Sequence, residues 1–370
     1  KRGYRVAAIG RTGGGNFGHG LHRAFQGING VEMVAVADPD DAGRARAKEQ
    51  SGASRDYADY REMLQREELD IVAVCPRWLD QRLEMVLACL EAGCHVYCEK
   101  PFAISLEDGD QMVETADRSN LKIAVAHFHG AYMPGAAGLR QFINDGGIGD
   151  LLELHAHGKH DHRGGGEDMM DLGTHLFNLM TCLAGNVDWM SARITTAGRE
   201  LAVGDIHEAT EPLGLVAGDR IDSYFAFNDG VAGFFDSKRH SVGVNERYGL
   251  EIIGSEGIVS LRGGTTAEGL MSYPFPLWAP AREEQSWQPL FLPDAPTGVT
   301  DETGLAHRIA VLDLIDSIER DGQPICSGRD GVSALEMALA AYDSQISKTR
   351  IDFPVARRSH PLERWRQQDA

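Results

Sequence analysis

The stretch that decides the fold is Tyr4–Gly20, which reads YRVAAIGRTGGGNFGHG. Its first part, Tyr4–Gly10, is a short apolar run typical of a buried β-strand, and the residues after it are rich in glycine. The next run, Leu21–Gln26, is predicted to be helical. Glycine lets a backbone turn sharply and approach a pyrophosphate, whose charge then meets the N-terminus of the following helix. A strand, a glycine loop and a helix in this order therefore predict a dinucleotide-binding loop.

The glycine spacing and one acidic residue define the predicted cofactor site. Gly13, Gly15 and Gly18 satisfy the pattern G-x-G-x-x-G. Asp38 ends the next apolar run, where a carboxylate accepts hydrogen bonds from an adenosine ribose and repels a 2′-phosphate, so NAD is favoured over NADP. Two alternatives stay open: Asp38 could only cap the helix after it, and Arg11 could assist a phosphate. The loop residues predicted to contact the cofactor are Gly10, Thr12, Gly13, Gly15, Asn16, Phe17 and Gly18.

Strands and helices alternate from this loop up to residue 127. The predicted strands after the first are Val31–Asp38, Ile71–Cys75, His95–Cys98 and Lys122–His127. The predicted helices between them are Asp41–Gln50, Tyr60–Arg66, Gln81–Glu91 and Leu106–Ser119. Near-continuous apolar strands that alternate with amphipathic helices are typical of a parallel sheet covered by helices on both faces. The sequence therefore predicts an α/β fold in which residues 1–127 form a doubly wound, Rossmann-type dinucleotide-binding domain.

A different pattern begins after residue 127. Leu151–His160 alternates as a strand, and helices are expected around Gly135–Asp145 and Asp168–Leu183. The later candidate strands are Trp189–Thr196, Ile221–Asn228, Val231–Lys238, Gly249–Ile253, Ile258–Arg262 and Leu270–Tyr273. Two helices, around Leu305–Arg320 and Gly331–Ser347, close the chain. Residues 128–370 are therefore predicted to form an α+β domain with a large, mostly antiparallel open sheet, and the cleft between the domains is the default ligand site.

Composition narrows the partners and the compartment. The chain has 370 residues, of which 36 are Lys or Arg and 55 are Asp or Glu, giving a formal net charge of −19. So acidic a surface repels nucleic acid and anionic membranes, and no apolar run reaches the ~18 residues that a membrane-spanning helix needs. Six cysteines without a C-x-x-C pair predict free thiols in a reducing compartment. No signal peptide is visible, which favours the cytoplasm, although an export signal could have been removed because the chain starts without Met.

Two further motifs carry a family resemblance. Glu99-Lys100-Pro101 directly follows a strand that ends CHVYC, and Gly164–His175 reads GGGEDMMDLGTH. With the glycine loop and Asp38, these motifs resemble the glucose–fructose oxidoreductase, inositol dehydrogenase and rhizopine catabolism (Gfo/Idh/MocA) family, which carries E-K-P after a late strand and a glycine stretch followed by D-x-x-x-H. The resemblance spans essentially the whole chain. It implies an NAD(P)-dependent oxidoreductase of sugars, cyclitols and their derivatives, which forms homodimers or homotetramers through the open face of the second-domain sheet.

Three residues are predicted to carry the chemistry. Asp171 and His175 lie four apart on a predicted helix and so face the same way. A hydroxyl must lose its proton before it can lose a hydride; His175 suits that task, and Asp171 could orient the imidazole. Lys100, at a strand end beside the cofactor, could stabilise the developing alkoxide. The resemblance implies the same roles; without it, Asp171 and His175 could be an ordinary helix pair and Lys100 an exposed surface lysine.

Departures from the family pattern bear on the substrate. The family places a His four residues after the Pro of its T-P loop, where this chain has Asp80, and Asn178 stands where an Asp is common three residues after the catalytic His. The glycine loop is also longer than usual. The further predicted cofactor contacts are Cys75, Pro76, Arg77, Glu99, Lys100 and His127. The predicted substrate contacts are Lys100, His129, His157, Lys159, Arg163, Asp171 and His175.

Histidine and basic residues are dense between positions 155 and 163. His155, His157 and Lys159 alternate and so share one face of a strand. Histidine is a common zinc ligand, but the family needs no metal, so we predict no metal site and favour a polar lining of a sugar cleft. Lys159 and Arg163 could bind a carboxylate, sulfonate or phosphate of the substrate, or they could be solvated charges.

Three functions compete at this point. The first is the reversible oxidation of a secondary hydroxyl on a sugar, cyclitol or glycoside, with sugar C3 as the favoured position and nicotinamide as the hydride acceptor. The second is a redox-neutral, NAD-dependent glycosidase that oxidises a glycoside at C3, eliminates the aglycone, adds water and returns the hydride. Lys100 and His175 would serve both reactions. The third, a nucleotide-sensing regulator, is disfavoured because it would have no need of Lys100, Asp171 and His175.

Overall fold

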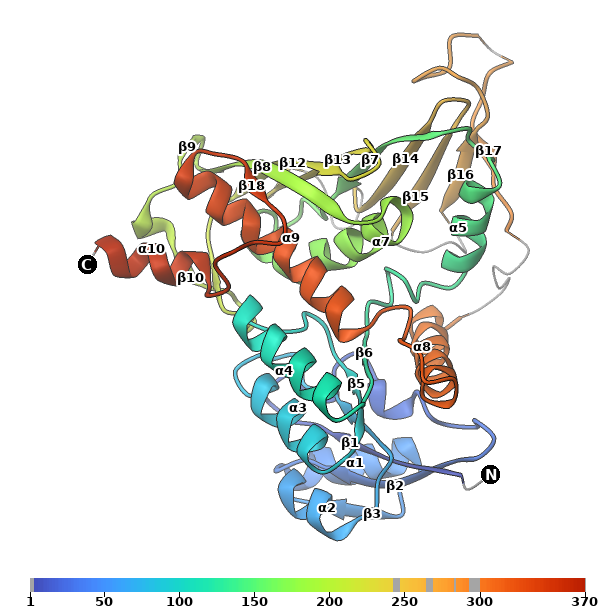
Figure 1. Cartoon of the computed structure of the whole chain (residues 1–370), viewed down its shortest axis with the longest axis vertical. Helices are drawn as coiled ribbons and strands as arrows, with labels where there is room; N and C mark the ends of the chain where they lie inside the picture. Colours follow the sequence, from blue (N-terminus) through green and yellow to red (C-terminus); the bar gives the residue numbers. More distant parts are fainter. Residues whose placement is uncertain (1–2, 242–246, 264–268, 283, 293–299, 370) are drawn as a thin grey trace. The chain divides into compact units, whose positions relative to one another are not determined.

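The structure is a computed structural model that describes residues 3–241, 247–263, 269–282, 284–292 and 300–369. The chain divides into two compact units, which Figure 1 draws. The first comprises Lys1–Phe128, Glu211–Gly214 and Thr303–Val332, and the second comprises His129–Thr210, Leu215–Glu302 and Ser333–Ala370. The sequence analysis placed the division after residue 127 and assigned residues 211–214 and 303–332 to the second domain.

A six-stranded parallel sheet forms the first unit, in the order β3-β2-β1-β4-β5-β6. Its strands are β1 (Tyr4–Ile9), β2 (Val31–Ala37), β3 (Arg55–Tyr57), β4 (Ile71–Val74), β5 (His95–Cys98) and β6 (Ile123–Val125). Its α-helices are α1 (Asp41–Ser51), α2 (Tyr60–Arg66), α3 (Arg82–Glu91), α4 (Leu106–Arg118) and α8 (Glu302–Glu319). The apolar run Ile71–Val74 of β4 is fully buried, as expected for a central strand covered on both faces. The predicted doubly wound fold is confirmed.

The strand order reverses between β1 and β4, and this reversal marks one edge of the sheet. Gly10, Asp38 and Cys75 directly follow the carboxyl ends of β1, β2 and β4. Open α/β sheets bind their ligands outside the carboxyl ends of the strands at such a reversal. The fold therefore brings the predicted cofactor residues to the edge where a dinucleotide belongs.

The helix predicted at Leu21–Gln26 is not formed. The structure has only a short 3-10 turn there, η1 (Leu21–Arg23), with turns on either side. Gly20 and Gly27, which flank this segment, have φ angles of 94° and 67°, in the left-handed region that ends a helix. Because a three-residue turn has no significant dipole, the helix N-terminus that was predicted to meet the pyrophosphate is not formed.

The second unit is built on a ten-stranded sheet in the order β17-β16-β15-β14-β7-β13-β12-β8-β18, with β9 beside β8. Its strands are β7 (Leu151–His157), β8 (Val187–Thr196), β9 (Arg199–Glu200), β12 (Arg220–Phe227), β13 (Ala232–Lys238), β14 (Gly249–Gly254), β15 (Ile258–Arg262), β16 (Leu270–Tyr273), β17 (Gln288–Pro289) and β18 (Ile351–Asp352). Of the neighbouring pairs in the described ranges, all are antiparallel except β7 with β13. The predicted mostly antiparallel sheet is confirmed.

The other described elements of the second unit are short, apart from the four helices α5 (Ala136–Asn144), α7 (Thr174–Ala184), α9 (Gly328–Ser347) and α10 (Pro361–Asp369). The short elements are α6 (Gly166–Asp168), the π turn η2 (Met169–Gly173), η3 (Val203–Asp205) and the strand pair β10 (His207–Glu208) and β11 (Leu215–Val216). The helix predicted at Asp168–Leu183 is thus interrupted by a π turn.

The two faces of the large sheet differ in what they contact. On one face, Phe225 of β12 and Phe235 of β13 are buried, and their ring centroids lie 5.5 and 4.9 Å from that of Phe177 in α7. The side chains of the other face are mostly half-buried, because strand residues alternate between the two faces. This second face carries a row of neighbouring rings formed by His155, Phe234, Tyr224 and Trp189.

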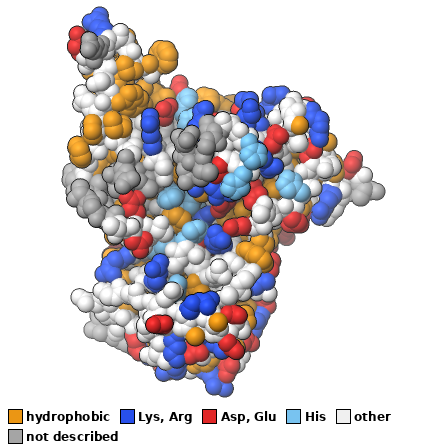
Figure 2. Space-filling view, turned by 180° about the vertical axis from the view of Figure 1, so that it is seen from behind, with side chains coloured by type: hydrophobic (Ala, Val, Ile, Leu, Met, Phe, Trp, Pro, Cys, Tyr) orange, Lys and Arg blue, Asp and Glu red, His pale blue; other side chains and the backbone are white. Residues whose placement is uncertain are grey.

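The face of the molecule drawn in Figure 2 carries side chains of both charges. Figure 2 shows acidic and basic side chains interspersed over the face that it draws, and hydrophobic side chains gathered at one end of the second unit. Trp278 and Phe291 are 89% and 83% exposed in that unit. Within the described ranges, none of the helices combines the length and the hydropathy required to span a bilayer. All six cysteines are free thiols, and only Cys182 among them is not buried.

Candidate functional site

The glycine loop forms a short finger at the end of β1. The backbone N–H of Arg11 donates to the carbonyl of Asn16 at 3.0 Å, and the N–H of Asn16 donates back at 2.9 Å. Gly13 and Gly15, inside this closed turn, have φ angles of 81° and 88°, which glycine adopts without strain. Two of the predicted cofactor residues therefore have a conformational reason to be glycine.

Asp38, at the end of β2, holds the glycine loop by hydrogen bonds. Its carboxylate, only 1% exposed, accepts hydrogen bonds from the backbone N–H of Thr12 at 3.0 Å and from the Thr12 hydroxyl at 2.8 Å. The helix cap is a different residue, because Asp40 accepts the N–H of Gly43 at 2.6 Å at the start of α1. The structure therefore excludes the alternative in which Asp38 serves only as the N-cap of α1.

Gly15 and Gly18 allow the loop to pack closely against the segments that follow β4 and β5. A Cβ added to Gly15 would lie 2.3 Å from the backbone nitrogen of Arg77. One added to Gly18 would lie 2.4 Å from the carbonyl oxygen of Cys75 and 2.6 Å from Oε1 of Glu99. The structure thus gathers the predicted cofactor residues of the loop, of the segment after β4 and of the E-K-P motif into one place.

A pocket of about 290 Å³ opens beside Asp38. Pro39, Tyr60 and Met85 give it apolar walls, while Asp38 gives it a carboxylate. A flat base against apolar side chains and a ribose at a carboxylate are what the adenosine half of a dinucleotide requires, so the residues present fit NAD. Sequence reasoning missed Tyr60 and Met85. The remaining lining residues are Gly10, Arg11, Ala37, Ala58, Asp59, Arg61 and Gln81.

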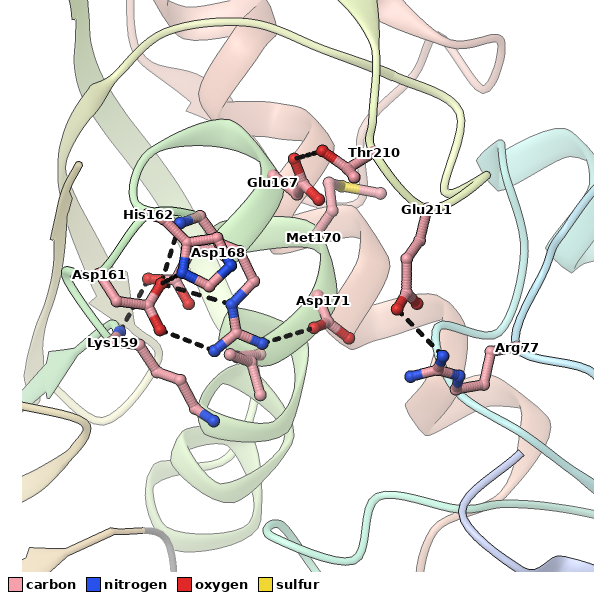
Figure 3. A network of polar contacts seen from close by, with 12 residues as sticks. Arg77, Lys159, Asp161, His162, Glu167, Asp168, Met170, Asp171, Thr210 and Glu211 are labelled. Carbon is pink, nitrogen blue, oxygen red and sulfur yellow. Dashed lines mark hydrogen bonds and ion pairs between the residues drawn. The ribbon is translucent and has the colours of Figure 1, made fainter. Parts of the chain in front are cut away.

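Arg11 of the glycine loop contacts Asp80, which stands where the family has a His. Nη1 of Arg11 lies 2.7 and 2.8 Å from the two carboxylate oxygens of Asp80. The guanidinium also lies 5.6 Å from the ring centroid of Trp78. The pair joins the glycine loop to the segment after β4, so Arg11 in this structure binds a carboxylate of the chain. Arg77 is paired in the same unit with Glu211 at 3.0 Å, as Figure 3 shows.

Glu99 connects the glycine loop to Lys100. Its Oε1 accepts the backbone N–H of His19 at 3.0 Å and lies 2.5 Å from Nδ1 of the same residue, while Oε2 accepts the N–H of Lys100 at 2.6 Å. Burial disfavours this charge, but His19 and Lys100 outweigh it and hold the pKa of the carboxyl well below its usual range. Burial and the Lys100 ammonium lower the pKa of the nearby His127 to about 3, so its imidazole is neutral at pH 7.

The loop geometry predicts a large difference between two glycine substitutions. Gly18→Ala combines a φ of 60° with the two close contacts above, and we expect it to destabilise the fold by roughly 3 kcal/mol. Gly13→Ala is the matched control, because its φ is 81° but no atom lies within 4 Å of the added Cβ, so about 1 kcal/mol is expected. Urea unfolding measures both; equal losses would contradict this geometry.

His175 lies in an aromatic cluster of the second unit. It begins α7 beside Thr174 and is fully buried. Its ring centroid lies 5.1 Å from that of His129, which in turn lies 5.9 Å from the ring of Tyr248. The structure therefore brings together two of the predicted substrate residues, and it adds Tyr248, which no sequence signal marked.

Asp171 lies in the π turn that precedes α7 rather than in a regular helix. Its Oδ2 is 3.7 Å from Nη1 of Arg163, and Nη2 of Arg163 is 2.8 Å from Oδ2 of Asp161, in the network of Figure 3. The fully buried Asp168 accepts the N–H of Lys159 at 2.8 Å and the hydroxyl of Ser237 at 2.6 Å. Burial raises the pKa of Asp168. The sequence missed Asp161 and Asp168, although Asp168 lies inside the quoted glycine motif.

His157 is placed on the other face of the sheet from Asp168. Its Nδ1 lies 2.5 Å from Oδ1 of Asp236, and Nε2 of His160 lies 2.7 Å from Oδ2 of the same carboxylate. Burial opposes the charge of Asp236, but the two imidazoles hold its pKa well below the usual range. The structure does not bring His157 together with Asp171. Among the described residues, no group of His, Cys, Asp or Glu has the arrangement of a metal site.

Comparison with known proteins identifies relatives over both units. Residues 5–127 match the model described as oxidoreductase family, NAD-binding Rossmann fold, and residues 141–353 match the C-terminal alpha/beta domain of the same family. Inositol 2-dehydrogenase of Salmonella typhimurium is 30% identical over 142 residues, which are 38% of this chain and 41% of that protein. A 2,7-anhydro-N-acetylneuraminate hydratase of Mediterraneibacter gnavus is 33% identical over 150 residues, which are 39% of this chain and 37% of that protein. The chain thus aligns with about two fifths of the length of these curated relatives.

A solved structure extends the likeness of fold to nearly the whole chain. Levoglucosan dehydrogenase, solved in complex with NADH and levoglucosan, superposes with a TM-score of 0.78 and 20% identity over 95% of this chain and 100% of that one. At this identity the likeness concerns the fold. Because the two family models together cover most of the sequence, the chain belongs to the Gfo/Idh/MocA family of oxidoreductases with an NAD-binding Rossmann domain.

Proposed function

We propose that this chain is an NAD-dependent oxidoreductase that moves a hydride between nicotinamide and a secondary hydroxyl or ketone of a sugar, cyclitol or glycoside, with sugar C3 as the favoured position. The observation that carries the proposal is the bond from Lys100 to Glu99, whose other oxygen holds the glycine loop. It fixes a buried lysine at the carboxyl edge of the sheet, beside the residues that fit the cofactor. The names of the relatives, inositol 2-dehydrogenase and levoglucosan dehydrogenase, support a polyhydroxylated substrate.

The chain's own residues have separate roles in this proposal. The bound NAD supplies the hydride acceptor at C4 of its nicotinamide. Lys100 donates a hydrogen bond to the reacting oxygen and stabilises the negative charge that develops there. His175 takes the proton of the hydroxyl at an imidazole nitrogen, and Asp171 holds a negative charge near the imidazolium so formed. The other predicted cofactor contacts keep the roles given in the sequence analysis, whereas His157, paired with Asp236 on the other face of the sheet, has no role in this proposal.

A second candidate reaction uses the same residues without net oxidation. In it, the substrate is oxidised transiently at C3, loses its aglycone by elimination, gains water and is reduced again. The relative named as a hydratase favours keeping this candidate, because adding water is a redox-neutral net reaction. The two candidate reactions require the same residues. They differ in the product that accumulates, which is NADH for the dehydrogenase and free aglycone for the glycosidase.

The first experiment is an incubation of the purified protein with NAD and a panel of free sugars, cyclitols and glycosides, in which NADH absorbance and aglycone release are followed together. NADH that accumulates with each turnover supports the dehydrogenase and names its substrate. Aglycone release without lasting NADH supports the redox-neutral glycosidase. Consumption of none of the substrates, with NAD bound, would overturn the proposed function.

Assembly and compartment belong to the same proposal. Copies of the chain pair as a homodimer or homotetramer through the half-buried face of the second-unit sheet, where the ring row His155, Phe234, Tyr224 and Trp189 supplies contact area. The free thiols support a reducing compartment, for which we propose the cytoplasm.

Asp38→Ala tests the cofactor assignment. The carboxylate has about four acceptor positions; the N–H and hydroxyl of Thr12 and the N–H of Asp40 occupy three of them, so one remains for a ribose hydroxyl. We expect the dissociation constant for NAD to rise roughly 10-fold or more and the preference over NADP to fall, because the charge that repels a 2′-phosphate is lost. Thr12→Val removes only the hydroxyl bond and should weaken NAD without changing the preference. An unchanged NAD-to-NADP ratio in Asp38→Ala, measured by titration of both cofactors, would contradict the assignment.

A further inference from the structure

Lys159 presents a cation to the aromatic cluster that contains His175. Its backbone N–H is held by Asp168 at 2.8 Å, directly after β7 and Gly158, so the position of its Cα is fixed. Its side chain is half-buried, and Nζ lies 5.5 Å from the ring centroid of Tyr248. Because the rings of Tyr248, His129 and His175 are neighbours, the Lys159 ammonium lies at the edge of the aromatic cluster that contains His175, the proposed proton acceptor.

The other cation of this region is already neutralised. Arg163 lies between two carboxylates, with Asp161 at 2.8 Å and Asp171 at 3.7 Å. A guanidinium held in this way has little charge left to offer a ligand. The sequence alone does not distinguish Lys159 from Arg163 as the residue that binds an anion, whereas the ion pairs of Arg163 do.

Lys159 differs from Arg163 in its ion pairs. Within the described ranges, no carboxylate forms an ion pair with its Nζ, and Figure 3 shows its side chain extending away from the Asp161 carboxylate. Burial and the neighbouring Arg163 lower the pKa of this lysine, although the carboxylates around it act in the opposite direction. A partly desolvated ammonium against an aromatic face gains most from an anion that reaches it.

We propose that Lys159 binds a carboxylate of the substrate, so that the substrate is an acidic sugar such as a uronate or its glycoside. The inference rests on the proposed function, because it places the anion beside the residue that takes the hydroxyl proton. A single ammonium that forms no ion pair with the described residues matches the single charge of a carboxylate. A phosphate monoester carries nearly two charges and would leave one without a partner.

The test compares matched substrate pairs, glucose with glucuronate and galactose with galacturonate, as free sugars and as glycosides, in the presence of NAD. We expect wild-type kcat/KM to be roughly 10- to 100-fold higher for the carboxylate of a pair. Lys159→Met keeps the aliphatic stem against Tyr248, and it should lower kcat/KM for the carboxylate by the same factor while changing the neutral sugar by less than about threefold.

Two further variants complete the design. Lys348→Met removes the same charge from an exposed lysine paired with Glu200, and it should leave both substrates unchanged. Lys159→Arg retains a cation and should recover part of the preference, which keeps the test valid if Lys159→Met fails to fold.

The outcomes separate this inference from the proposed function. If the wild type and Lys159→Met both turn over the neutral and the acidic substrate of a pair at equal rates, the inference about Lys159 is overturned. The proposed oxidoreductase function is not affected by that result. If no member of either set is consumed, the unfolding temperature of the NADH-loaded protein decides. Stabilisation by glucuronate and galacturonate in the wild type but not in Lys159→Met supports the anion site, and equal stabilisation in both overturns it.

Discussion

Lys100→Ala is expected to lower kcat by roughly 10³-fold while the dissociation constant for NAD changes by less than about threefold. The ammonium acts on the oxygen that becomes negative during hydride transfer, so its loss is felt in the transition state far more than in cofactor binding. The backbone of Lys100, through its bond to Glu99, would keep the glycine loop in place in the variant. Steady-state kinetics on the best substrate of the panel and an NAD titration measure the two quantities.

Lys122→Ala is the control for this substitution. Lys122 is also a nearly buried lysine of the first unit, but its Nζ pairs with Asp321 at 3.0 Å, beside the start of β6. Its removal should cost stability and leave kcat per folded molecule unchanged. Wild-type turnover in Lys100→Ala would show that the E-K-P lysine is not part of the reacting group, and the site would have to be reassigned.

His175→Asn should lower kcat by roughly 10²- to 10⁴-fold, with binding of NAD unaffected. Asparagine can donate and accept hydrogen bonds in the space of the ring, but it cannot take a proton near neutral pH. The loss should therefore appear in kcat more than in KM, since the substrate still finds a polar side chain at this position. Single-turnover measurements at saturating substrate isolate the chemical step.

His360→Asn provides the comparison for His175. His360 is equally buried in the second unit, at 1% exposure, and burial lowers its pKa to about 4, so it is a neutral structural histidine. Its replacement should alter the unfolding temperature but not the rate. If His175→Asn lowers kcat no more than His360→Asn does, then His175 is a structural core histidine and another group accepts the proton.

Five of the six strands of the first unit could be predicted from the sequence because they are largely buried and therefore read as continuous apolar runs, as in Ile71–Val74. The edge strand β3 was missed, because its residues Arg55–Tyr57 are polar and mostly exposed. The structure of the segment after the glycine loop could not be predicted from the sequence. The helical pattern of Leu21–Gln26 is too short to form a helix between two glycines with left-handed backbone. The π turn before α7 was equally hidden, since its residues are also compatible with a regular helix.

The candidate site was predictable where chemistry follows a strand end and hidden where it depends on side-chain pairing. Asp38 and the E-K-P motif follow strand ends and could be placed from the sequence. The pairing of Arg11 with Asp80 joins residues far apart in the chain; alone, Arg11 was a candidate phosphate contact and Asp80 a departure from the family pattern. The neutralisation of Arg163, which distinguishes it from Lys159, required the positions of two carboxylates.

The most direct test of the central claim is a single-turnover experiment with a sugar or glycoside that carries deuterium at the carbon to be oxidised. The wild-type protein is mixed with one equivalent of NAD, the reaction is quenched at successive times, and mass spectrometry locates the label. The account predicts deuterium on the nicotinamide, where it accumulates in a dehydrogenase or returns to the product in the redox-neutral reaction. Consumption of the substrate with no label reaching the nicotinamide at any time would contradict hydride transfer as the function of this chain.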